Sequence, residues 1–324
     1  MLSRTADHLY WMSRYTERAE NLARMLDVNY QMSLLPQSVQ TIERGWAALL
    51  EISELTSAFT AQQATITPEA VMRFMVSDTS NPSSIMRCLQ GARENARAVR
   101  GSITTELWET INTTWLDAQR FMHEGMLKRA PAEFFEWVKF RSHLIRGVHL
   151  GTMMRGEAYD FIQLGTFLER ADNTARLLDV KFLAASEVHD DDTDPVDEFY
   201  YWTAILRSVS AFENYRKVYR DVITPERIAE LMILSLGMPR SLVNCLHEVV
   251  DTLSRVRNSQ SSHTQSAALR LLSELRDFSI EDIFEKGLHE YLTEFLSRIN
   301  AVGSGISQDF LLPLQVDTEV PLSS

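Results

Sequence analysis

Cysteine, glycine and proline are scarce in this chain of 324 residues, and their scarcity narrows the fold. The two cysteines, Cys88 and Cys245, supply neither a disulfide framework nor a four-thiolate metal site. Twelve glycines and nine prolines leave long segments without a turn residue, which favours helices over many short strands. The sequence therefore predicts an all-α protein with buried, inert thiols in a reducing compartment, the cytoplasm.

Basic charge and long apolar runs are also lacking. The 32 lysines and arginines face 44 aspartates and glutamates, so the formal net charge is −12. A protein that neutralises nucleic-acid phosphates, or that binds an anionic membrane surface, needs a basic face. No apolar run reaches the ~20 residues of a membrane span, and the opening MLSRTADHLYWM is polar where a signal peptide would be apolar. We expect neither nucleic acid nor membrane among the partners.

One segment of the sequence occurs twice. Residues 16–28 read TERAENLARMLDV and residues 168–180 read LERADNTARLLDV, with nine of twelve residues identical from Glu17 and from Glu169 onward. Further matches follow in the same order, at an offset that drifts from 152 to 157: Trp46 with Trp202, Thr67-Pro68-Glu69 with Thr224-Pro225-Glu226, Met75 with Met232, and Cys88 with Cys245. This pattern indicates a duplicated helical unit of roughly 155 residues.

The duplication predicts a helical bundle of two tandem halves, residues 1–152 and 153–302, followed by an irregular tail at 303–324. We expect the halves to pack about a pseudo-twofold axis, which would bring the two copies of the repeated segment together as in an isologous dimer fused into one chain. Helices are expected at about 5–35, 38–60, 68–77, 83–100, 103–128, 131–152, 157–187, 198–220, 225–235, 239–258, 263–277 and 281–301. The acidic segment 187–198, EVHDDDTDPVDE, is predicted to be a loop, either a solvated connector or a cation-binding segment.

On a helix, the residues of the repeated segment lie on an apolar face and a charged face. The charged positions are Glu17, Glu20, Asn21 and Arg24 in the first copy and Glu169, Asp172, Asn173 and Arg176 in the second, with Arg18 and Arg170 on the boundary. Three interpretations stay open for them: a solvated face, a buried structural network where the halves meet, or a ligand or partner site. The shared order Glu-Arg-Ala-acid-Asn indicates that these side chains have specific partners.

No catalytic, metal or cofactor motif stands out. Glu17-x-x-Glu20 is similar to the carboxylate pairs of di-iron bundles, but that pattern also needs Glu-x-x-His on two helices, and the chain has none. Nucleophile elbows, phosphate-binding glycine loops and zinc spacings are missing as well. We predict no metal and no cofactor, with binding of a hard cation as the remaining alternative.

The segments LSRTADHLYWMSRYTERAENLARMLDV and FIQLGTFLERADNTARLLDVKF resemble the bacterial alpha-E family, named for its helices and its Glu-Arg motif. That motif corresponds to Glu17-Arg18 and Glu169-Arg170 here. Members of the family are found beside, or fused to, circularly permuted ATP-grasp proteins and near transglutaminase-like proteins, and some lie near a proteasome-like peptidase. The resemblance implies a system that forms and hydrolyses amide bonds on peptides.

The resemblance favours a helical accessory or scaffold protein over an enzyme. Such a protein would bind an ATP-grasp ligase, or its peptide product, near the Glu-Arg motifs, with a transglutaminase-like protein as a further partner and no catalytic residue of its own. The alternative is an enzyme of amide chemistry in which Glu17 and Glu169 act as acid-base groups, which requires burial to separate their pKa values. A third interpretation is a structural homo-oligomer without a ligand.

Overall fold

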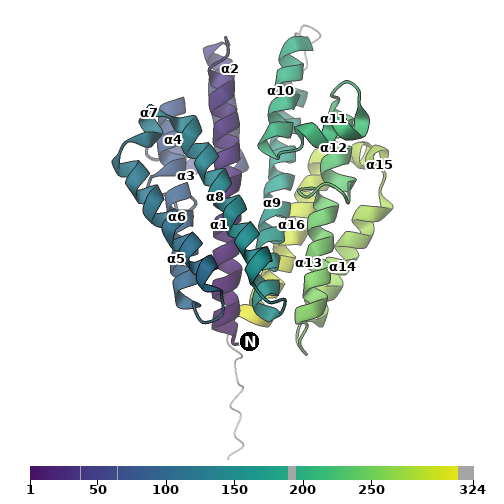
Figure 1. Cartoon of the computed structure of the whole chain (residues 1–324). Coiled ribbons are helices and arrows are strands. Elements are labelled where there is room, and N and C mark those ends of the chain that lie inside the picture. Colours follow the sequence, from purple (N-terminus) through teal and green to yellow (C-terminus); the bar gives the residue numbers. More distant parts are fainter. Residues whose placement is uncertain (37, 64, 189–194, 313–324) are drawn as a thin grey trace, which may run out of the picture.

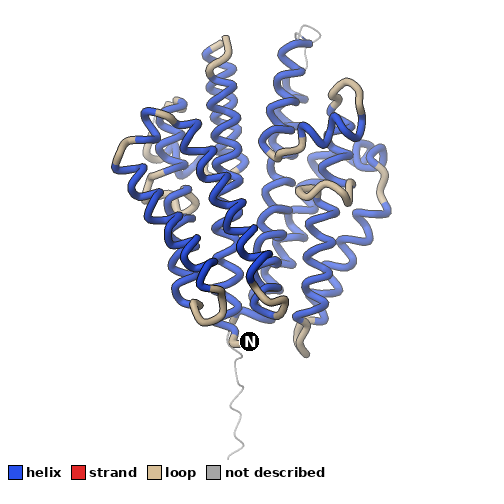
Figure 2. Tube along the Cα trace, in the orientation of Figure 1, coloured by secondary structure: helices blue, strands red, loops and turns tan. Residues whose placement is uncertain are grey.

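The computed structural model describes residues 1–36, 38–63, 65–188 and 195–312. These residues form sixteen α-helices and one π-helical turn and contain no strand, which confirms the predicted all-α class (Figure 2). The helices are α1 (Ser3–Ser33), α2 (Val39–Ile52), α3 (Thr56–Thr60), α4 (Pro68–Val76), α5 (Ile85–Ala98), α6 (Thr105–His123), α7 (Met126–Arg129), α8 (Pro131–Thr152), α9 (Glu157–Val188), α10 (Pro195–Ser208), α11 (Phe212–Tyr219), α12 (Pro225–Leu234), α13 (Leu242–Val256), α14 (Ser262–Asp277), α15 (Ile280–Lys286) and α16 (Leu288–Ile306), and the turn is η1 (Ser307–Leu311).

The two long helices α1 and α9 pack against each other at the centre of the molecule (Figure 1). Around α1 lie α5 and α8, and α6 packs on both of these; around α9 lie α13 and α16, and α14 packs on both of these. Further contacts cross the centre, since α2 packs on α9 while α10 and η1 pack on α1. Because helices lie on several sides of α1 and α9, these two helices bury polar as well as apolar positions.

Helices α1 and α9 approach each other closely at Gly165. A Cβ atom at this position would lie 2.3 Å from the backbone oxygen of Tyr10 and 2.2 Å from the hydroxyl of Ser13. Both distances are well inside van der Waals contact, so only glycine lets the helices cross at this spacing. Ser13 is the position that the sequence repeat matches to Gly165, so the helices cross at equivalent points of their sequences.

Four helices that the sequence predicts as continuous are broken in the structure. The breaks fall at residues with left-handed backbone: Glu54 (φ 56°), Gly125 (φ 72°), Ser210 (φ 54°) and Gly287 (φ 95°). The glycines adopt this conformation at little cost, whereas a side chain there is strained. Glu54 and Ser210 are matched by the repeat at the offset of the Trp46–Trp202 pair, so the same unusual turn follows α2 and α10.

The chain remains helical beyond Gly303, where the sequence predicts an irregular tail. Helix α16 continues to Ile306 and η1 follows, with Phe310 packed on Phe161 at 5.7 Å between ring centroids. The prediction is therefore wrong for 303–311, because burial of apolar side chains such as Phe310 and Leu311 extends the helix; residues 313–324 lie outside the described residues.

The structure describes only part of the acidic segment 187–198. The loop prediction for 187–198 is wrong at both ends, because α9 continues to Val188 and α10 begins at Pro195, while residues 189–194 lie outside the described residues.

Within the part of the chain that the structure describes, no helix has both the length and the apolar character needed to cross a bilayer.

Candidate functional site

The two Glu-Arg motifs meet where α1 crosses α9. Arg170 donates from Nε and Nη2 to the two carboxylate oxygens of Glu17, at 2.9 and 3.0 Å. Arg18 donates in the same way to Glu169, at 2.6 and 2.9 Å. Each motif thus gives its glutamate to the arginine of the other, the reciprocal pattern of an isologous contact. Both pairs are bidentate, which is the strongest geometry for a guanidinium on a carboxylate.

A larger cluster surrounds Glu17. We define the Glu17 centre by its charged side chains, Glu17, Glu20, Arg24, Arg146, Arg170 and Arg240. Arg146, from α8, donates from Nη2 to Glu17 at 2.8 Å and to Glu20 at 2.5 Å. Arg240, from the loop before α13, lies 2.9 Å from Glu17 and donates to Glu20 at 2.6 Å. Two carboxylates therefore meet four guanidiniums, a formal surplus of two positive charges.

The cluster around Glu169 has a different charge. We define the Glu169 centre by Glu169, Asp172, Glu54, Arg14, Arg18 and Arg176. Arg14 donates from Nε to Glu169 at 2.8 Å, beside the bidentate Arg18. Arg176 grips Asp172 at 2.8 and 3.1 Å. Three carboxylates meet three guanidiniums, so this centre is formally neutral.

A second reciprocal contact connects the left-handed turns to the centres. Arg24 binds Glu20 one helical turn earlier and reaches Ser210 Oγ with Nη1 at 2.5 Å. Arg176 binds Asp172 one turn earlier and reaches the carboxylate of Glu54 with Nη1. The turn after α2 thus contacts α9, and the turn after α10 contacts α1. The matched turns differ in one respect, since Glu54 supplies a charge where Ser210 supplies a hydroxyl.

Burial and charge set the ionisation of both motif glutamates. Glu17 is 1% exposed and Glu169 is 5% exposed. Burial alone would raise the pKa of Glu17, but Arg170, Arg240 and Arg146 together outweigh it and lower the pKa well below its usual range. Burial would likewise raise the pKa of Glu169, and Arg14 and Arg18 lower it on balance. Both carboxylates are held as anions, and an anion stabilised in this way is a weak proton acceptor.

The structure places nearly all of the predicted positions in these centres. The predicted members are Glu17, Glu20, Arg24 and Arg170 in the first and Glu169, Asp172, Arg18 and Arg176 in the second. Asn21 accepts from Arg240 at 2.7 Å, while Asn173 lies half-buried outside both centres. Because Glu17, Glu20 and Arg24 are buried, the solvated-face interpretation is wrong for the first copy.

Sequence reasoning missed the residues that are not repeated. Arg14 is matched to Thr166 and Arg240 to Ser83, so neither appears in a comparison of the two copies. Arg146 comes from α8, more than a hundred residues along the chain from the carboxylates that it binds. These arginines could have been found only by asking which cations neutralise the buried carboxylates of Glu17, Glu20 and Glu169.

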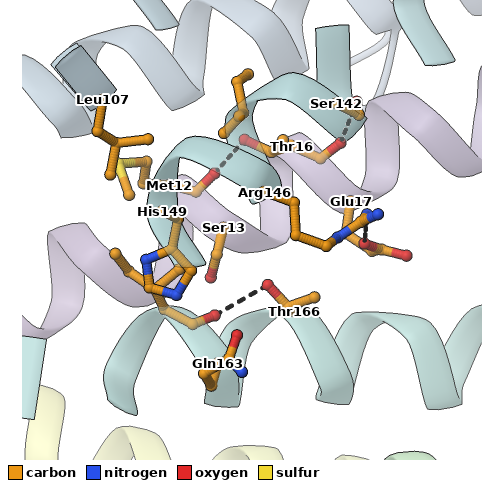
Figure 3. Close-up of a pocket in the computed structure, with 12 residues that line it drawn as sticks. Met12, Ser13, Thr16, Glu17, Leu107, Ser142, Arg146, His149, Gln163 and Thr166 are labelled. Carbon is orange, nitrogen blue, oxygen red and sulfur yellow. Dashed lines mark hydrogen bonds and ion pairs between the residues drawn. The ribbon is translucent and has the colours of Figure 1, made fainter. Parts of the chain in front are cut away.

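A small cavity adjoins Glu17 and Arg146 between α1, α8 and α9 (Figure 3). Its volume is about 30 Å³, and Ser13, Gln163 and His149 also line it. This space suits water rather than an organic substrate. His149 is buried and stacks on Tyr159 at 4.5 Å between ring centroids; burial lowers its pKa to about 4, against a smaller opposing effect of Gln163. The neutral imidazole is therefore part of the packing.

The structure gives little support for thiol chemistry or metal binding. Cys88 and Cys245 are free and buried, and burial raises the pKa of both thiols to about 12, which confirms the prediction of inert cysteines. Among the residues that the structure describes, no group of three or more histidine, cysteine, aspartate or glutamate side chains is arranged to hold a metal ion.

These features define a class of all-helical protein in which two sequence-matched core helices are joined by reciprocal Glu-Arg pairs with buried carboxylates. The chain belongs to the Alpha-E family: the family model, described as a predicted alpha-helical domain with a conserved ER motif, matches residues 1–311.

The chain is also similar to uncharacterised mycobacterial proteins. One from Mycobacterium bovis and two from strains of Mycobacterium tuberculosis are each 24% identical to it over 323 residues, which cover 92% of this chain. The match takes up 35% of each relative, so the chain spans about a third of their length. No solved structure matches the chain.

Proposed function

We propose that this protein is a non-catalytic scaffold in which the Glu-Arg motifs hold the molecule together and an outer surface binds a partner. The supporting observation is that the buried carboxylates of Glu17 and Glu169 each form a bidentate pair with the arginine of the other motif. Arginines of the same chain already pair with both carboxylates, and the cavity beside Glu17 is too small for a peptide.

The scaffold consists of two halves, residues 1–152 and 153–302, related by a pseudo-twofold axis. The reciprocal pairs across the crossing of α1 and α9 support this arrangement, as do the reciprocal contacts of Arg24 with Ser210 and of Arg176 with Glu54. The same order of packing, α5, α6 and α8 around α1 and α13, α14 and α16 around α9, agrees with it.

The outer face of α8 is the surface that we assign to the partner. It exposes Phe140 (72%), Leu144 (40%) and Leu150 (52%), and α8 also carries Arg146 of the Glu17 centre. On α16, which packs on α9 and α14 as α8 packs on α1 and α6, the exposed residues include Thr293, Ser297 and Asn300. A row of exposed large apolar side chains is typical of a protein-binding surface, and α16 has no comparable row.

The partner is an ATP-grasp-type ligase, with a transglutaminase-like protein as a second candidate; both come from the family resemblance. The protein would serve, in the cytoplasm, a system that forms amide bonds on peptides. It would bind the ligase, or the peptide product of the ligase, near the Glu-Arg motifs.

Co-purification of the chain with an ATP-grasp-type ligase of the same organism tests this function. We expect the wild-type chain to retain the ligase and the variant Phe140→Asp/Leu144→Asp to lose it. The matched control is Ser297→Asp/Ala301→Asp on α16, which should bind as the wild type does. Retention by the α8 variant would contradict the assigned surface, and no binding by the folded wild-type chain would contradict the partner. If α8 instead joins two copies of the chain, native mass will show a dimer that the α8 variant lacks.

The enzyme alternative has less support from the geometry. An acid-base role for Glu17 or Glu169 needs a carboxylate that can take up a proton near neutral pH, whereas the surrounding arginines lower both pKa values. If Glu17→Asp and Glu169→Asp abolish amide-bond formation in a reconstituted system while both variants stay folded, the enzyme would be favoured over the scaffold.

A further inference from the structure

The Glu17 centre has more positive charge than its own carboxylates neutralise. Four guanidiniums meet two carboxylates there, whereas three meet three in the Glu169 centre. Part of the difference arises at one matched position, where Glu54 provides a carboxylate to Arg176 and Ser210 provides only a hydroxyl to Arg24. Partly buried surplus charge is costly unless an anion compensates it.

His143 lies between two of these arginines and cannot satisfy both. Its Nε2 is 3.0 Å from Arg24 Nη2, and its Nδ1 is 3.3 Å from Arg146 Nη1. A neutral imidazole has one acceptor nitrogen, so only one of the two guanidiniums can donate to it. Burial lowers the pKa of His143, so the ring stays neutral and adds no charge. One guanidinium N–H at this point therefore lacks an acceptor on the ring.

This edge of the Glu17 centre is open to solvent. His143 and Ser210 are exposed, and the side chain of Arg146 is 27% exposed. In the Glu169 centre, the matched place is taken by Glu54, whose side chain is largely exposed and reaches inward to Arg176. At this edge the Glu17 centre has the partly exposed guanidinium of Arg146, with buried Arg24 behind it, where the other centre holds its own carboxylate.

We propose that Arg24, His143, Arg146 and Ser210 form a binding site for a carboxylate group, which takes the place that Glu54 occupies beside Arg176. The ligand would accept hydrogen bonds from the guanidiniums of Arg24 and Arg146, in the manner typical of arginine with carboxylates. The site does not depend on the ligase partner, because the surplus charge belongs to this chain alone.

Titration with succinate, whose two carboxylates match the surplus of two charges, tests the site. Binding is measured by calorimetry, and thermal stability is followed in parallel, with sodium chloride keeping the ionic strength constant. The decisive variant is Ser210→Glu, which supplies the carboxylate from the chain itself. Glutamate is accommodated in this left-handed conformation at the matched Glu54. We expect Ser210→Glu to weaken succinate binding by at least about tenfold, the size of one lost charge-assisted hydrogen bond.

Two control variants separate the effect of the added charge from the effects of added bulk and of a change in the other centre. Ser210→Gln adds similar bulk without charge and should weaken succinate binding less than Ser210→Glu does, and Arg176→Gln changes the other centre and should leave succinate binding unchanged. Equal succinate binding by the wild type and Ser210→Glu would overturn the site, as would stabilisation that sodium chloride reproduces. Inorganic phosphate binding tightly where succinate does not would overturn the assignment to carboxylates.

Discussion

The two Glu-Arg centres have the same core but different surroundings. Each contains one glutamate in a bidentate pair with the arginine of the other motif. Around Glu169 the charges balance, because Glu54 closes the centre from the surface. Around Glu17 two additional arginines, Arg146 from α8 and Arg240 from the loop before α13, leave a surplus of positive charge. The repeated residues therefore explain how the helices are joined, and the unrepeated ones explain how the two centres differ.

Removing one glutamate at a time should separate the two centres most strongly. We expect Glu17→Gln and Glu169→Gln each to lower the free energy of unfolding by about 3–5 kcal/mol, since each leaves buried or half-buried guanidiniums without their carboxylate. The loss should be larger for Glu17, because its centre already has surplus positive charge and Arg170 and Arg240 are both buried. Urea denaturation followed by circular dichroism measures both. Glu136→Gln, at an exposed position on α8, is the control and should change stability by less than about 0.5 kcal/mol.

Acid should affect the centres in sequence. The folded pKa values of Glu17 and Glu169 lie below the unfolded value of about 4.3, so their contribution is complete above that pH and is lost as pH falls through the folded values. We expect stability that does not depend on these two groups from pH 8 to 5. Below pH 4, Glu169 should lose its contribution before Glu17, which has three arginines rather than two. Unfolding measured against pH for the wild type and both glutamine variants checks the order, and a loss near neutral pH that both variants abolish would contradict it.

The crossing of α1 and α9 keeps both centres in register. Gly165→Ala should cost about 3 kcal/mol, near the upper end of overpacking effects, because the added methyl group meets the backbone of Tyr10. Gly147→Ala on α8 is the matched control: its Cβ would meet open space, so it should stabilise the protein by about 0.4–1 kcal/mol. Thermal unfolding of both variants gives the comparison. An unaffected Gly165→Ala variant would show that the crossing is not tightly packed.

Removing one arginine from each centre should have unequal effects. Arg240→Met leaves Glu17 and Glu20 with other guanidiniums and reduces the surplus charge, and burial already lowers the pKa of Arg240. Arg18→Met leaves Glu169 with Arg14 alone. We expect a loss of about 1 kcal/mol or less for Arg240→Met and about 2–3 kcal/mol for Arg18→Met. The reverse order in urea denaturation would contradict the charge difference between the centres.

Much of this fold can be predicted from the sequence, and the exceptions have physical reasons. The predicted helix start at Thr67-Pro68 is confirmed, since Thr67 Oγ1 accepts from the amide of Ala70 at 3.2 Å. The breaks at Glu54 and Ser210 could not be predicted, because neither is a glycine and contacts with Arg176 and Arg24 on another helix accompany the turn. Local preferences carry no information about such distant partners.

The candidate site shows the same division. Repetition identifies Glu17, Arg18, Glu169 and Arg170, and the structure brings these four residues together. The charge of each centre depends on Arg146 and Arg240, which no repeat or spacing indicates. Repetition in the sequence therefore identifies the residues of the pairs, but it indicates neither which residue pairs with which nor the balance of charge around them.

The central claim is that Glu17 and Arg170 act together as a structural link between α1 and α9. A double-mutant cycle of Glu17→Gln and Arg170→Gln, with unfolding followed by urea denaturation, tests it most directly. We predict a coupling energy of about 2 kcal/mol or more, because the second substitution costs little once the first has broken the pair. Additive losses, with coupling below about 0.5 kcal/mol, would contradict the claim.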